Sequence, residues 1–131
     1  MAIASGQFDV TRIPAPLSEA AADSGLGRHA LVKRYHGALD ATGSGEMLSA
    51  MGAVQGSAAY VALERVDGAL DGRSGSFVLH HSGSMTRGQP SLLVCVVPDS
   101  ATGALAGLQG TLAIRIEEGR HFYDFEYSFA S

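Results

Sequence analysis

The end of the chain alternates regularly between two kinds of side chain. Every second position from 121 to 129 is aromatic or histidine, and most positions between them are polar. Because side chains alternate between the two faces of a strand, this pattern predicts a strand with one hydrophobic face. The rest of the chain must cover that face, which indicates a curved sheet around an enclosed space. The residues predicted to face this space are His121, Tyr123, Phe125, Tyr127 and Phe129.

Segments of strand length fill most of the remaining chain, and 17 glycines are spread among them. Turn residues between alternating segments are typical of many short strands, and Asp71-Gly72 is a strong hairpin signal. Leu17 to Ala22 is long enough only for a turn or two of helix, so we interpret it as a loop across one end of the sheet. The predicted strands are Gln7–Ile13, Arg28–Leu39, Ser44–Met51 after a turn at Thr42-Gly43, Ala58–Leu70, Ser74–Met85, Leu92–Val97, Thr111–Glu117 and His121–Phe129.

The number of strands predicts the fold class. Eight strands joined mainly by short turns can close into a barrel that fills or nearly fills its own interior. Closure also removes the exposed edges of the sheet. We therefore predict an all-β protein, an eight-stranded antiparallel closed barrel with at most one short helix, forming a single domain over residues 1–131.

The segment Leu92–Val97 departs from the alternation because it is apolar on both faces. If one face lines the barrel, the other must be covered from outside. A second copy of the chain is the simplest cover, so we predict a homo-oligomer, with a dimer favoured. The alternative is a loop of the same chain, such as Pro14 to Leu26, lying across the strand. Cys95 is interpreted as a small buried hydrophobic residue of this segment.

Composition and charge exclude several classes of function. The net charge is −4, and the single lysine and the scattered arginines form no phosphate-binding stripe, so we expect no nucleic acid partner. The single cysteine excludes an internal disulfide and fits a reducing compartment. The first residues lack the pattern of a secretory signal, and the longest apolar run is too short to cross a bilayer. We therefore expect a cytoplasmic protein without a membrane partner.

The motifs of nucleotide and metal sites are missing from the sequence. Gly43-Ser44-Gly45 and the segment Gly103 to Gly110 lack a Gly-Lys-Ser/Thr sequence and are predicted to be turns. His80 and His81 are adjacent and therefore point to opposite faces of a strand, so they do not form a simple pair of metal ligands. We expect neither a metal nor another cofactor.

Candidate chemistry lies in the middle of the chain. His81 shares a strand face with Phe77 and Leu79, so we place His81 inside the barrel and His80 outside. The alternation around Glu64 is ambiguous. Glu64 either faces the interior, with Lys33, His81 or a tyrosine as partner, or lies on the surface beside Arg65. An inward Glu64 would be a candidate general base.

Three stretches resemble a bacterial family of small proteins whose members have no established reaction. They are Tyr60 to Gly83, Val97 to Gly110 and His121 to Tyr127, and the resemblance covers most of the chain from about Arg28 onward. The barrel of this family is similar to that of the plant allene oxide cyclases, which implies an apolar cavity and a tendency to form homo-oligomers. The resemblance also implies that the polar positions of these stretches face the interior, namely Tyr60, Glu64, His81, His121 and Tyr123.

Two functions of different class fit this pattern. A binding module would hold a small apolar metabolite in the barrel. A cofactor-independent isomerase or cyclase would hold a lipid-like or polyketide-like substrate in a folded conformation while Glu64 or His81 moves a proton. No group that would stabilise an electrophile is evident, which places binding first and leaves enzymatic activity undecided. The predicted catalytic residues are Glu64 and His81, and the predicted ligand-binding residues are Lys33, Tyr60, Phe77, His121 and Tyr123.

Overall fold

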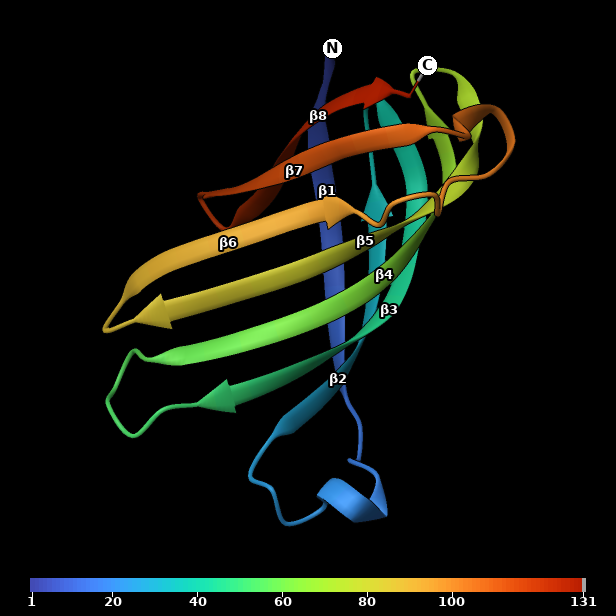
Figure 1. Ribbon diagram of the computed structural model, residues 1–131. Coiled ribbons are helices and arrows are strands. Elements are labelled where there is room, and N and C mark those ends of the chain that lie inside the picture. The colour runs from blue at the N-terminus through green and yellow to red at the C-terminus, as the bar shows by residue number, and fades with distance from the viewer. Residues whose placement is uncertain (131) are drawn as a thin grey trace.

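The computed structural model, which describes residues 1–130, is a closed barrel of eight strands (Figure 1). Each strand is antiparallel to the next, and β8 pairs with β1 to close the sheet. The predicted all-β antiparallel barrel is therefore confirmed. Helical structure within residues 1–130 is limited to two 3-10 turns, η1 (Glu19–Ala21) and η2 (Gly103–Leu105). The strands are β1 (Ala2–Pro14), β2 (Gly27–Tyr35), β3 (Leu39–Met51), β4 (Ala58–Leu70), β5 (Arg73–Thr86), β6 (Gln89–Val96), β7 (Leu108–Glu117) and β8 (Arg120–Phe129).

The hairpin predicted at Asp71-Gly72 is confirmed. These two residues alone join β4 to β5, and both have positive φ, 48° for Asp71 and 85° for Gly72. Positive φ at both central residues is the conformation of the two-residue turn whose twist matches that of the paired strands. The side chain of Asp71 also accepts a hydrogen bond from the hydroxyl of Tyr127, which ties the hairpin to β8.

The turn predicted at Thr42-Gly43 is wrong. β2 ends at Tyr35, residues 36–38 make the turn, and β3 continues without interruption through residues 42–45. Gly43-Ser44-Gly45 is therefore part of a strand and not a turn. In the other glycine-rich segment, η2 occupies Gly103–Leu105, but Gly110 lies within β7.

The first strand is longer than predicted because it serves two neighbours. Its first half, from Ala2 to Phe8, pairs with β8, and its second half, from Phe8 to Pro14, pairs with β2. A long shared strand of this kind follows from the stagger that closure of a barrel requires. The alternation of the sequence detected only the half that begins at Gln7.

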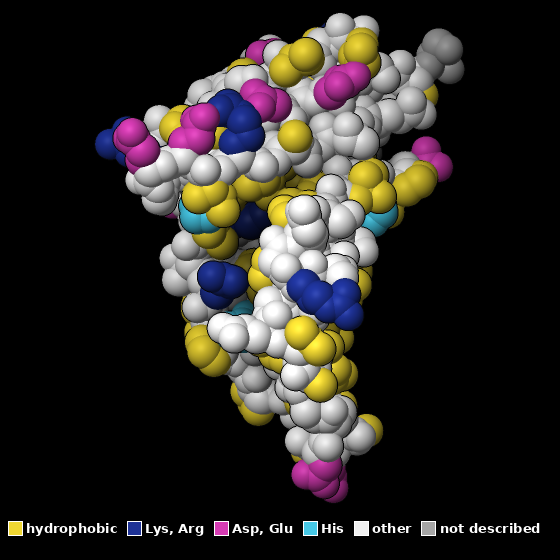
Figure 2. Space-filling model, turned by 90° about the vertical axis from the view of Figure 1, so that its left-hand side faces the viewer, with side chains coloured by type: hydrophobic (Ala, Val, Ile, Leu, Met, Phe, Trp, Pro, Cys, Tyr) yellow, Lys and Arg dark blue, Asp and Glu magenta, His cyan; other side chains and the backbone are white. Residues whose placement is uncertain are grey.

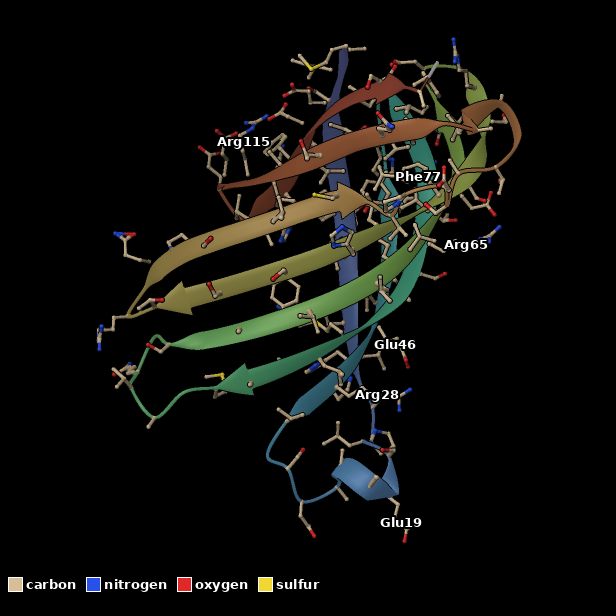
Figure 3. The ribbon with its side chains drawn as sticks, viewed as in Figure 1. Glu19, Arg28, Glu46, Arg65, Phe77 and Arg115 are labelled. Atoms are coloured by element: carbon tan, nitrogen blue, oxygen red, sulfur yellow. The ribbon has the colours of Figure 1, made fainter. Side chains whose placement is uncertain are left out.

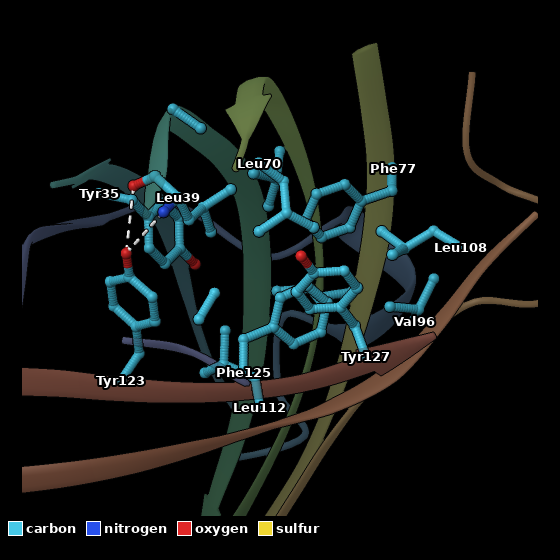
Figure 4. Close-up of a cluster of buried hydrophobic side chains, with 14 of the residues drawn as sticks. Tyr35, Leu39, Leu70, Phe77, Val96, Leu108, Leu112, Tyr123, Phe125 and Tyr127 are labelled. Atoms are coloured by element: carbon cyan, nitrogen blue, oxygen red, sulfur yellow. Dashed lines mark hydrogen bonds between the residues drawn. The ribbon is translucent and has the colours of Figure 1, made fainter. Parts of the chain in front are cut away.

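Hydrophobic side chains fill the end of the barrel that carries the β4–β5 hairpin (Figure 4). Phe77 and Phe125 stack there, with ring centroids 5.8 Å apart and planes 14° from parallel. An eight-stranded barrel is just wide enough for its own side chains to fill it. This packed cluster therefore closes one end and confines any internal space to the other. Its most completely buried large members are Tyr35, Leu39, Leu70, Phe77, Leu79, Leu105, Tyr123 and Phe125.

The opposite end of the barrel is open. β6 and β7 are paired at a single position, Cys95 with Thr111, and diverge from there toward the β5–β6 and β7–β8 hairpins (Figure 1). Figure 2 faces this end and shows a hollow whose walls carry hydrophobic, basic and histidine side chains. The sheet is therefore closed between β6 and β7 by a single pair of residues, and the interior is accessible from this side.

The loop between β1 and β2 does not cover β6. It lies beside the outer face of β3 to β5, where Arg28 donates a hydrogen bond to the carbonyl oxygen of Pro16 at 2.8 Å and pairs with Glu46 (Figure 3). Leu93, on the outer face of β6, remains 54% exposed. Cys95 also lies on that outer face and is half-buried, so its interpretation as a buried core residue is wrong. No helix among residues 1–130 has the length and hydropathy to span a bilayer.

Candidate functional site

Glu64 faces the interior of the barrel, so the inward alternative holds. It is 1% exposed, whereas the next residue in sequence, Arg65, points away from the barrel (Figure 3). Val61 and Leu63 on the same strand point outward and are 54% and 60% exposed. The exposure of these two apolar residues explains why the alternation of β4 was ambiguous.

Three donors from two other strands surround the Glu64 carboxylate. Lys33 on β2 donates from Nζ to Oε1 at 2.9 Å, and the hydroxyl of Tyr35 on β2 donates to Oε2 at 2.5 Å. Nε2 of His81 on β5 lies 2.8 Å from Oε1. Lys33 and His81 are 6% and 4% exposed. The structure thus contains a buried polar cluster of Lys33, Tyr35, Glu64 and His81.

These contacts set the protonation of the cluster. Burial by itself raises the pKa of Glu64. This effect is outweighed by the hydrogen bond of His81, by the charge and hydrogen bond of Lys33 and by the hydrogen bond of Tyr35. The pKa of Glu64 is therefore lowered below its ordinary value. The pKa of Tyr35 is raised well above 10.0 by burial and by the adjacent Glu64. The cluster therefore holds a carboxylate beside a neutral phenol.

The ionised state of Glu64 assigns the tautomer of His81. A carboxylate only accepts hydrogen bonds, so the ring nitrogen that faces it, Nε2, must carry a proton. In the neutral ring Nδ1 is then unprotonated and can accept a proton. Glu64 is therefore better placed to orient His81 than to act as a base itself, because its oxygens are already occupied by donors.

Two glycines of β3 make the cluster possible. β3 lies between β2 and β4, and a Cβ on Gly43 would lie 2.3 Å from Oε2 of Glu64. A Cβ on Gly45 would lie 2.7 Å from the Cα of Glu64. With no side chain at these two positions, Lys33 and Glu64 meet across the intervening strand. Glycine in a strand interior often marks such a close approach.

A cavity of about 430 Å³ lies beyond the cluster at the open end of the barrel. Its apolar wall includes Met47, Met51, Met85 and Leu92, and its polar lining includes Arg12, His29 and Tyr60. Tyr60 connects the cavity to the cluster, because its ring centroid lies 6.3 Å from that of His81. Burial and the charge of Glu64 raise the pKa of Tyr60, and the charge of Arg12 opposes this shift.

The remaining predicted site residues do not line this cavity. Phe77 is stacked on Phe125 in the filled end. The hydroxyl of Tyr123 accepts a hydrogen bond from the backbone N–H of Leu39 at 2.9 Å and donates to the carbonyl oxygen of His36 at 2.8 Å, so it secures the β2–β3 turn. His121 is half-buried, and its ring centroid lies 5.2 Å from that of Phe8.

Sequence reasoning missed Tyr35, Arg12 and His29 as site residues. Tyr35 shares a face of β2 with Lys33, and this alternation was the available signal. Arg12 and His29 lie near the ends of their strands, where alternation does not distinguish a side chain at a cavity mouth from one in solvent.

A second cavity, of about 830 Å³, lies on the outer surface. It is bounded by the β1–β2 loop, through Leu17 and Leu26, and by the outer face of β3 to β5, through Leu48, Val61 and Leu63. His80 pairs with Leu63, which is exposed on the outer face of β4, so the predicted outward placement of His80 is correct. The side chains of the buried polar cluster lie on the inner face of the sheet, although His81 also borders the groove.

The fold and these features define a small antiparallel barrel that is filled at one end and open at the other. The sequence profile of the family described as "Protein of unknown function (DUF3224)" matches residues 4–127, and the chain belongs to this family. A crystal structure at 1.84 Å of a DUF3224 protein of unknown function from Shewanella oneidensis MR-1 is 53% identical in sequence. It superposes with a TM-score of 0.93 over 100% of this chain and 98% of that one. No curated protein matches the sequence.

Proposed function

We propose that this protein binds a small, largely apolar metabolite in the interior cavity at the open end of the barrel. The observation that supports the proposal is the 430 Å³ cavity, with methionines and Leu92 as its apolar wall and a few polar side chains at defined positions. Cavities of roughly 300 to 1,000 Å³ with this lining are typical of small-molecule sites. The filled opposite end and the hydrogen-bonded cluster give the cavity a rigid floor.

Native mass spectrometry of freshly purified protein tests the proposal, with Gly83→Ala as the site variant. A Cβ on Gly83 would lie 2.4 Å from Cε1 of Tyr60 and 3.2 Å from Cδ1 of Leu92, so the substitution must displace side chains that line the cavity. The matched control is Ser82→Ala, the preceding residue, whose side chain is exposed on the opposite face of the strand and does not line the cavity.

Wild-type protein and Ser82→Ala are expected to retain a ligand mass, and Gly83→Ala is expected to retain less. Equal ligand content in all three proteins would place the ligand elsewhere. Wild-type protein that retains no mass and takes up no apolar probe in titration would contradict the proposal.

A second candidate function is a cofactor-independent isomerase or cyclase. Its support is the Glu64–His81 pair, in which the carboxylate holds Nε2–H and leaves Nδ1 to accept a proton. The likeness to the allene oxide cyclase barrels that we proposed from the sequence points to the same class. In this mechanism His81 is the proton carrier, Glu64 orients it, and Lys33 holds Glu64 in place.

Hydrogen exchange in D₂O separates the two functions. The ligand released from the protein is incubated with wild-type protein or with His81→Gln, and deuterium incorporated at carbon is measured by mass spectrometry. An isomerase is expected to incorporate deuterium only with the wild-type protein. A ligand that binds tightly but exchanges hydrogen no faster than in buffer would contradict the isomerase function and support binding without catalysis.

A further inference from the structure

Two polar side chains of the interior cavity lack partners within residues 1–130. Nδ1 of His29 is buried and makes no hydrogen bond. Arg12 forms none of the ion pairs found in this part of the chain, although several other cations do, such as Lys33 with Glu64 and Arg28 with Glu46. A buried polar atom without a partner costs free energy, so it points to a group supplied from outside the chain.

Arg12 and His29 lie on the same inner surface of neighbouring strands. In the β1–β2 pairing Arg12 is opposite Leu31 and Pro14 is opposite His29, so Arg12 and His29 are diagonal neighbours on one face. Diagonal neighbours are within reach of long side chains. Arg12, His29 and Tyr60 line the same cavity, and the charge of Arg12 acts to lower the pKa of Tyr60.

The cavity is lined by both basic polar and apolar side chains. None of its described lining residues is acidic, and the adjacent Glu64 is already neutralised by Lys33. An anionic group at Arg12 would therefore meet no repelling charge from the lining. The apolar part of the cavity includes Met47, which pairs directly with His29, and Met51 and Met85 farther along the sheet, and these flexible side chains adapt to irregular apolar shapes.

We infer that the cavity takes an amphipathic organic anion. Its anionic group pairs with Arg12 and accepts a hydrogen bond from Nδ1–H of His29, and its apolar body packs against the methionines and Leu92. This inference rests on the proposed binding function and specifies the ligand class. It also assigns binding roles to Arg12 and His29.

Two fluorescent probes that differ only in charge test this inference. 8-Anilinonaphthalene-1-sulfonate and N-phenyl-1-naphthylamine share one aromatic body, and only the first carries a sulfonate. We expect the anionic probe to bind more tightly to the wild-type protein. Arg12→Met should lower the affinity for the anionic probe about fivefold, which is the effect of losing one partly exposed charge pair. The affinity for the neutral probe should not change. His29→Leu should also weaken only the anionic probe.

Two control variants locate the probes. Arg65→Gln removes an arginine from the outer surface and should leave both affinities unchanged, whereas Gly83→Ala should weaken both probes if they occupy the cavity. Circular dichroism verifies that each variant is folded.

Each alternative outcome identifies what has failed. Equal affinities for the two probes, or an anionic probe that is insensitive to Arg12→Met, would overturn the anion inference while leaving the proposed function intact. Binding of neither probe, or binding of both without any effect of Gly83→Ala, would overturn the proposed function and the inference with it.

Discussion

At the scale of single residues, Glu64 of β4 links side chains from β2 and β5 inside the barrel. It accepts hydrogen bonds from Lys33, Tyr35 and His81 while being almost completely inaccessible to water. Burying one charge is costly unless it is paired, so each member of the cluster depends on the others. The cluster is therefore sensitive to the loss of any one partner.

Substituting Glu64 by Gln is expected to lower the free energy of unfolding by about 3 kcal/mol at neutral pH, because it leaves the Lys33 charge buried without a counter-charge. Arg65→Gln, at the exposed neighbouring position, should change it by no more than about 0.5 kcal/mol. Urea denaturation followed by circular dichroism measures both values. A Glu64→Gln variant as stable as the Arg65 control would show that the ion pair does not stabilise the fold.

The effect of Glu64→Gln should also depend on pH. The folded-state pKa of Glu64 is lowered below its ordinary value of 4.5, so its stabilising contribution is fully present above pH 4.5 and is lost as the pH falls through the folded-state pKa. The difference in thermal stability between wild type and Glu64→Gln should therefore be constant near neutrality and narrow below pH 4.5. A difference that widens on acidification would contradict the assignment of Glu64 as a carboxylate.

At the scale of elements, the β2–β3 turn is held from β8. The hydroxyl of Tyr123 contacts the backbone of His36 and Leu39 on either side of the turn, and its ring meets Tyr35 edge-on at a centroid distance of 5.7 Å. A strand from the other end of the chain therefore determines where β2 stops and β3 starts.

Substituting Tyr123 by Phe is expected to cost about 1 to 2 kcal/mol of stability, because the buried N–H of Leu39 loses its acceptor. The amide of Leu39 should also exchange faster with solvent. Tyr60→Phe is the matched control, since the hydroxyl of Tyr60 makes no hydrogen bond within the part of the chain that the structure describes. Hydrogen exchange measured by NMR gives both results, and unchanged protection at Leu39 would assign the turn to local sequence alone.

At the scale of the whole molecule, the outer surface carries an apolar region that the barrel itself does not cover. Leu48 and Val61 are paired neighbours on β3 and β4, and Leu93 lies on the same outer surface beyond Ser82 of β5. Leu48, Val61 and Leu93 are 42%, 54% and 54% exposed, and the 830 Å³ groove runs beside them. A cluster of exposed apolar side chains of this kind is typical of protein contacts.

We propose that this surface forms the contact of a homodimer. Burying apolar surface stabilises an association by about 25 cal/mol per Å² removed from water. Light scattering is expected to give the mass of a dimer for the wild-type protein and of a monomer for Leu93→Asp. Ile3→Asp, which places the same charge at an exposed apolar position on β1, should remain a dimer. A wild-type protein that is monomeric at high micromolar concentration would contradict the proposal.

The sequence by itself determined the properties that depend on local alternation and turn chemistry. The strand count, the Asp71-Gly72 hairpin, the inward His81 and outward His80, and the inward face of β8 all follow from the period of two and from residues suited to positive φ. These features are specified within a few residues of chain. They therefore do not depend on contacts between distant segments.

Only the tertiary structure decided what depends on distant segments or on depth along the barrel axis. Gly43 was misread as a turn because its role is to admit the carboxylate of Glu64 from the next strand. Phe77 has the predicted inward face, but alternation does not say at which depth an inward side chain lies, and Phe77 belongs to the filled end. The phase of β4 was settled by the partners of Glu64, because a buried carboxylate requires donors, and these come from segments 17 to 31 residues away in the sequence.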